Sequence, residues 1–180
     1  MKRFNCRFLF IILIIIFSVS INFTQTKNTP PCSSLEAKQF DFWVGNWVIY
    51  WITQTGDTAY GSNNVQKILG GCVINENFST KGAQPFNGKS YSVYNSTKKI
   101  WEQTWVDNTG AYMSFTGKFE NGKMILSREV SGKNNTKILQ RMVFYNITKT
   151  KFDWDWEYSK DNGKVWELNW RLHYVKHKNG

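Results

Sequence analysis

Apolar and polar residues alternate along most of this chain, and the alternation predicts strands rather than helices. From residue 47 onward the period is two, which is typical of β-strands that bury one face. The pattern predicts ten strands, over residues 47–53, 60–69, 72–80, 88–95, 100–107, 111–119, 123–130, 136–145, 151–158 and 164–175. Residues rich in Gly, Asn and Asp separate nearly all of them, because these residues tolerate the backbone angles of tight hairpins.

The connections between the predicted strands are too short for the crossover that a parallel pair requires. Each strand is therefore expected to pair with its neighbours in sequence, which makes a meander. Closure of such a sheet removes its two unpaired edges. We therefore predict an all-β fold, an antiparallel up-and-down barrel of about ten strands.

One hairpin sets the side-chain directions of its two strands. A two-residue turn at Asn121-Gly122 would pair Phe119 with Met124 and Gly117 with Leu126. The same register puts Arg128 on this otherwise apolar face.

The last hairpin predicts an aromatic face and a charged face. A three-residue turn at 161–163 would pair Trp156 with Leu168 and Trp154 with Trp170. The opposite face would carry the acids of the strand, with Asp153 across from Arg171. We expect the aromatic face to point into the barrel.

The first residues have the layout of a secretory signal peptide. A basic start precedes an apolar run from Phe8 to Phe17, which is too short to span a bilayer comfortably, and small residues follow. The predicted organisation is a signal peptide over 1–24, a linker over 25–31 and a single β-barrel domain over 32–180. Ser33 and Glu36 have capping-box spacing and predict a short N-terminal helix that ends near Phe40. The alternative is an uncleaved N-terminal anchor; after cleavage no stable membrane span is expected.

Charge and cysteine content bear on partners and compartment. The formal net charge is +10, but three basic residues lie in the predicted signal peptide and the lysines elsewhere are scattered through turns. Without a basic stripe, nucleic acid is not an expected partner. Cys32 and Cys72 form an even pair in an exported chain, which predicts a disulfide bond, with two separate thiols as the alternative. We expect a secreted or periplasmic protein.

Four segments in order resemble a known family. They are residues 40–47 (FDFWVGNW), 69–78 (LGGCVINENF), 101–107 (WEQTWVD) and 156–166 (WEYSKDNGKVW). Together they are similar to the DUF1579 group of small bacterial β-barrel proteins, within the lipocalin-like, or calycin, class. The resemblance covers about residue 32 to the end and implies an up-and-down barrel, but it implies no activity. Phe78 and Trp154 depart from the residues expected there, and they make the interior more aromatic.

Signatures of catalysis and metal binding are missing from the sequence. It has no Gly-x-Ser-x-Gly elbow, no phosphate-binding loop and no set of residues with metal-ligand spacing. We therefore predict no catalytic residue, no metal and no cofactor. His173 lies near the C-terminus, as a haem ligand does in some ten-stranded barrels, but the predicted register turns it away from the tryptophan face.

The aromatic content is the strongest chemical feature, at 17% of residues with nine tryptophans. Inward-facing rings could line a cavity for a flat or apolar ligand, or they could fill the core by packing on each other. The candidate ligand-binding residues are Glu76, Gln103, Trp105, Arg128, Arg141, Trp154, Trp156 and Trp170. A buried Arg128 would need an anionic partner such as the acidic head of a ligand; the alternative is that it extends to the rim of the barrel.

Three functions remain open at this point. The first is an exported carrier of a small hydrophobic or aromatic molecule. The second is a barrel enzyme, of isomerase or lyase type, that acts on an apolar substrate. The third is a protein with a filled core that self-associates, as a homo-oligomer, through an exposed aromatic patch.

Overall fold

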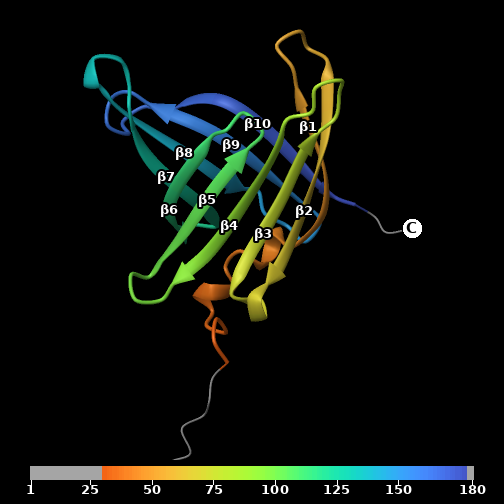
Figure 1. Cartoon of the computed structure of the whole chain (residues 1–180), viewed down its shortest axis with the longest axis vertical. Helices are drawn as coiled ribbons and strands as arrows, with labels where there is room; N and C mark the ends of the chain where they lie inside the picture. The colour runs from red at the N-terminus through yellow and green to blue at the C-terminus, as the bar shows by residue number, and fades with distance from the viewer. Residues whose placement is uncertain (1–29, 178–180) are drawn as a thin grey trace, which may run out of the picture.

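Ten antiparallel strands form one closed barrel in the computed structural model, which describes residues 30–177 (Figure 1). The strands are β1 (Gly45–Ile52), β2 (Thr58–Ile68), β3 (Val73–Thr80), β4 (Asn87–Asn95), β5 (Ile100–Asp107), β6 (Tyr112–Glu120), β7 (Lys123–Ser131), β8 (Lys137–Tyr145), β9 (Lys151–Ser159) and β10 (Glu167–Lys176). Each pairs with the next, and β1 pairs with β10 to close the sheet. The predicted fold class is confirmed. The predicted signal peptide and residues 25–29 of the predicted linker lie outside the described residues.

The hairpin between β6 and β7 has the predicted register. Asn121 and Gly122 both have positive φ, at 50° and 72°, which a two-residue turn of this kind requires. Phe119 pairs with Met124, and Gly117 pairs with Leu126. Gly117 is needed here, because a Cβ at this position would lie 1.8 Å from the carbonyl oxygen of Ile125.

The predicted register of the last hairpin is wrong, although its faces are correct. Trp156 pairs with Trp170 and Trp154 pairs with Leu172, and a bulge follows Leu168. The turn is longer than predicted, because the Ser159 hydroxyl accepts a hydrogen bond from the backbone of Gly163 and holds the loop open. The tryptophans nevertheless point inward, since the bulge restores the alternation.

Because the predicted register was wrong, the predicted pairing of charged residues on the outer wall was wrong as well. Asp153 lies opposite His173, and Asp155 lies opposite Arg171. The prediction of Asp153 across from Arg171 was therefore wrong by two residues. All four side chains still lie on the face that was predicted to point outward.

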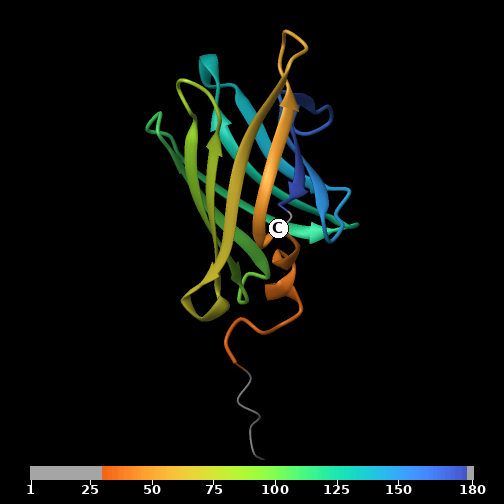
Figure 2. The same cartoon turned by 90° about the vertical axis from the view of Figure 1, so that its right-hand side faces the viewer.

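Two 3₁₀ turns before β1 close one end of the barrel (Figure 2). These are η1 (Glu36–Lys38) and η2 (Asp41–Trp43), and they confirm the short N-terminal helix that the sequence predicted, as two successive turns. The predicted capping box at Ser33 and Glu36 is not formed, because the N-cap residue of η1 is Leu35, which has no side-chain cap. The Ser34 hydroxyl, rather than Ser33, accepts the hydrogen bond from the backbone of Ala37.

Phe40 and Trp43 form an aromatic plug in this closed end. Both are almost fully buried. The Phe40 ring packs edge-on against the rings of Trp101 and Phe144, with centroids 4.9 and 5.4 Å away. The centroids of the Trp43 and Phe144 rings are 5.1 Å apart. Edge-to-face rings add to the stability that their burial supplies. The plug end of the barrel is therefore filled with side chains.

A disulfide bond joins Cys32 to Cys72, as predicted, with an S–S distance of 2.06 Å. Cys72 follows η3 (Leu69–Gly71), which lies between β2 and β3 at the plug end. The bond thus fastens the N-terminal arm beside the plug. A disulfide of this kind suggests an oxidising, extracytoplasmic environment.

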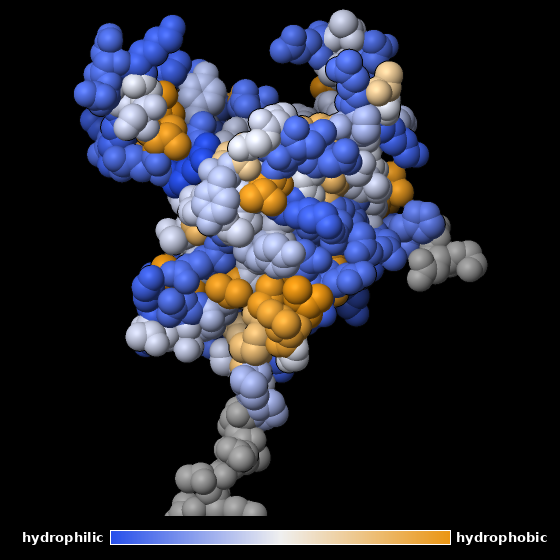
Figure 3. Space-filling model, viewed as in Figure 1, coloured by the Kyte–Doolittle hydropathy of each residue, from blue (hydrophilic) through white to orange (hydrophobic). Residues whose placement is uncertain are grey.

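The outer surface is largely hydrophilic on the side shown in Figure 3, and its most prominent apolar cluster lies at the end of the barrel beside the N-terminal arm. Large apolar side chains that lie mostly in solvent include Leu35, Leu69, Tyr112 and Val165. Within residues 30–177, no helix has both the length and the apolar character needed to cross a membrane.

Candidate functional site

A cavity of about 350 Å³ occupies the barrel interior between the plug and the opposite end. Its floor includes Trp43 of the plug and Tyr174, while Phe86 and Met113 line it where β4 and β6 begin. These strands begin at the end of the barrel farthest from the plug. The remaining lining comes from Glu76, Phe78, Trp105, Phe115, Arg128, Gln140, Met142, Phe144, Trp154, Trp156, Asn169, Trp170 and Leu172. The interior is thus packed at one end and hollow toward the other.

Three of the predicted tryptophans form one aromatic wall of the cavity. Trp154 and Trp156 lie nearly parallel, with ring centroids 6.5 Å apart. Trp170 meets Trp154 edge-on at 6.0 Å. They come together because β9 and β10 present alternate residues to the interior and are paired side by side. Flat apolar surfaces on this wall suit a flat apolar molecule.

Trp105 forms another part of the wall, on β5. Its indole lies over Gly88 of the neighbouring strand, where a Cβ would come within 2.0 Å of the ring. The indole nitrogen donates a hydrogen bond to Asp107, at 2.9 Å. The glycine and the carboxylate together hold the ring against the cavity.

Glu76 is the one acid that lines the cavity among the described residues, and it is 5% exposed. Its carboxylate accepts hydrogen bonds from Asn63 Nδ2 and from the Ser90 hydroxyl, each at 2.6 Å. These bonds favour the charged form, but burial dominates and raises the pKa of Glu76 to about 7. The cavity therefore holds a carboxyl group that can exchange a proton near neutral pH.

Arg128 lines the cavity from β7, on the half away from the plug. Its Nε donates a hydrogen bond to Gln140 Oε1 at 2.7 Å, and its guanidinium lies 5.4 Å from the Phe115 ring and 5.9 Å from the Trp156 ring. Partial burial lowers its pKa. The side chain is therefore near the open end of the barrel and also contacts the aromatic interior.

Arg141 does not belong to the site, which corrects the prediction. Its Nε donates to Glu157 on the outer wall at 2.5 Å, and its guanidinium lies 3.8 Å over the Trp166 ring. Met142, the next residue, points into the cavity, so Arg141 must point away from it. Glu157 is therefore the ionic partner of Arg141.

Gln103 is buried but is not one of the residues that line the cavity. Its side-chain amide donates to the Ser92 hydroxyl at 2.8 Å, within the wall formed by β4 and β5. Of the eight predicted residues, six line the cavity: Glu76, Trp105, Arg128, Trp154, Trp156 and Trp170.

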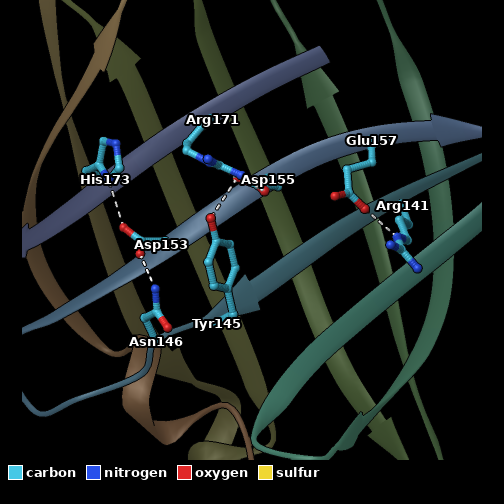
Figure 4. A network of polar contacts seen from close by, with 8 residues as sticks. All are labelled: Arg141, Tyr145, Asn146, Asp153, Asp155, Glu157, Arg171 and His173. Atoms are coloured by element: carbon cyan, nitrogen blue, oxygen red, sulfur yellow. Dashed lines mark hydrogen bonds and ion pairs between the residues drawn. The ribbon is translucent and has the colours of Figure 1, made fainter. Parts of the chain in front are cut away.

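The charged residues of β9 and β10 form a polar network on the outer wall (Figure 4). Arg171 donates to both carboxylate oxygens of Asp155, at 2.8 and 2.6 Å, and the Tyr145 hydroxyl adds a third bond at 3.2 Å. His173 contacts Asp153 at 2.7 Å. His173 is therefore on the outer wall, as the predicted face required, and away from the cavity.

Several residues that line the cavity were not among those predicted from the sequence. Met113 and Phe115 alternate on β6 and could have been assigned from the Asn121-Gly122 register. Asn169 could not, because it lies in the β10 bulge.

No protein-family model matches the chain, and no curated protein matches its sequence.

Proposed function

We propose that this protein is an exported binding protein that carries a small hydrophobic or aromatic molecule inside the barrel. The observation that supports the proposal is the hollow half of the barrel, a cavity of about 350 Å³ with a mainly aromatic lining. Ligand sites in proteins are typically concave and apolar, with a few polar groups that set orientation. This cavity has that composition.

The volume sets the size of the proposed ligand. Pockets for small molecules span roughly 300–1,000 Å³, and this one is near the lower end of the range. A molecule of one or two fused rings fits that space better than a long lipid chain. The parallel rings of Trp154 and Trp156 offer a flat surface for stacking.

The site of action is proposed to be outside the cytoplasm. The proposal combines the predicted signal peptide over residues 1–24 with the disulfide between Cys32 and Cys72. Membership of the DUF1579 group stays a prediction that rests on the four sequence segments.

Filling the cavity tests the proposal. Met113 points into the cavity, whereas its neighbour Tyr112 is 70% exposed. Met113→Trp should abolish binding of naphthalene-sized ligands by occupying their space, and Tyr112→Trp should leave binding intact. Isothermal titration calorimetry with a panel of one- and two-ring aromatic compounds measures both. Equal binding by the two variants, or no saturable binding by the wild type, would contradict the proposal.

A barrel enzyme is the second candidate, and Glu76 is the observation that favours it. A carboxyl group with a pKa of about 7 beside an apolar cavity suits general acid or base chemistry. If Glu76 abstracts protons from carbon, apolar ketones incubated with the protein in deuterated water should gain deuterium by mass spectrometry. Glu76→Gln should abolish that exchange. Absence of exchange across a panel of bound ketones would favour the carrier.

A further inference from the structure

The cavity contains a positive charge that no acid of the described chain neutralises. Arg128, Arg141 and Arg171 are the arginines within residues 30–177. On the outer wall, Arg141 binds Glu157 and Arg171 binds Asp155. Arg128 alone faces the cavity, and within this range it forms no ion pair and no hydrogen bond besides the one from Nε to Gln140.

This arrangement leaves N–H groups of the Arg128 guanidinium available to bind a ligand. An arginine side chain has five N–H donors, and Nε accounts for only one of them. The rings of Phe115 and Trp156 lie beside the group and partly shield it from water. A charge in such surroundings gains most from a partner that accepts two parallel hydrogen bonds.

The other charged group of the cavity stands on a different wall. Glu76 is on β3, and three strands on one side and five on the other separate it from Arg128 on β7. Asn63 and Ser90 already hydrogen-bond the Glu76 carboxyl. An anion beside Glu76 would be repelled whenever that carboxyl is ionised, so only the Arg128 wall favours negative charge.

We infer that the ligand is an aromatic or apolar acid, whose carboxylate binds Arg128 while its ring system lies in the cavity. This inference rests on the proposed binding function and adds the chemical class of the ligand. Gln140, and Asn169 in the β10 bulge, are polar residues that also line the cavity near the ends of their strands away from the plug. The carboxylate would therefore lie toward the open end and the rings toward the plug.

Two ligands of the same shape distinguish recognition of the negative charge from burial of the aromatic rings. Naphthoate and its neutral amide, naphthamide, differ mainly in the negative charge. Wild-type, disulfide-intact protein should bind naphthoate about 10- to 100-fold more tightly, the range expected for hydrogen bonds to a charged group. Arg128→Met should remove this preference and still bind naphthamide. Arg141→Met, an outer-wall control, should keep it.

Salt provides a measurement that requires no variant. Added sodium chloride should weaken naphthoate binding to the wild type and leave naphthamide binding unchanged, because ions screen only the charged contact. Arg128→Lys keeps the charge without the two-pronged geometry and should lose part of the preference.

The outcomes distinguish the two proposals. If the wild type binds both compounds equally, or if Arg128→Met keeps the preference for naphthoate, the inference is overturned and the binding function stands. If the wild type binds neither compound, the binding function fails and the inference fails with it.

Discussion

Replacing Glu76 with glutamine should change how stability depends on pH. In the folded protein the Glu76 pKa is about 7, compared with an ordinary value of 4.5. The folded state therefore holds a proton between these pH values that the unfolded chain has lost. The free energy of unfolding must fall as pH rises from 4.5 to about 7, because the unfolded state gains stability from ionisation that the folded state lacks.

The size of the effect follows from the two pKa values. A rise from 4.5 to about 7 corresponds to about 3 kcal/mol of destabilisation above pH 7, and almost none below pH 4.5. Glutamine has nearly the same shape and does not titrate. The stability of Glu76→Gln relative to wild type should thus increase by about 3 kcal/mol across this window.

Urea unfolding followed by tryptophan fluorescence, repeated from about pH 4.5 to about pH 8, measures this difference. Glu102→Gln is the control. Hydrogen bonds from Lys98 and Asn95 on the outer wall lower the Glu102 pKa, so this variant should show no such gain in stability as pH rises. A stability difference between Glu76→Gln and wild type that stays constant with pH would refute the reasoning, because it would mean that Glu76 ionises in the barrel as it does in water.

Three further predictions concern stability, and urea unfolding at pH 7 measures each. Substituting both Cys32 and Cys72 with serine should cost about 4 kcal/mol, since the bond closes a loop with a sequence separation of 40, and a loss below about 1 kcal/mol would contradict this. Phe40→Ala should cost about 3–5 kcal/mol, because it leaves a hole in the plug; a variant as stable as wild type would show that the plug is dispensable. Gly117→Ala should cost about 3 kcal/mol or more through its clash with the β7 backbone, and unchanged stability would exclude that clash.

The barrel could be predicted well from the sequence, because the signals that specify it lie within single strands and the turns between neighbouring strands. Period-two alternation and short turns require neighbouring strands to pair, and the glycine of Asn121-Gly122 fixes one register completely. The register predicted for the last hairpin was wrong, because side chains, rather than a glycine, shape its turn. Bonds from the backbone to Ser159 and Asp161 lengthen the loop, and turn composition alone gave no sign of them.

The site was predicted less completely than the fold. The tryptophans of β9 and β10 were assigned correctly, because charged residues mark the opposite face. Arg141 was misplaced, because Met142, Val143 and Phe144 are all buried and the alternation that marks a face is lost there. The hollow volume itself has no sequence signature, since the same rings would occur in a filled core.

The pairing of β1 with β10 has a consequence for how the chain folds. Trp47 pairs with Lys176, so the ring closes only after almost the whole described sequence is available. Contacts that span so much of the chain form slowly. Until the final strand arrives, the first strand and the ninth both have exposed backbone edges that another molecule could join. Nascent or C-terminally truncated chains should therefore aggregate more readily than the finished barrel.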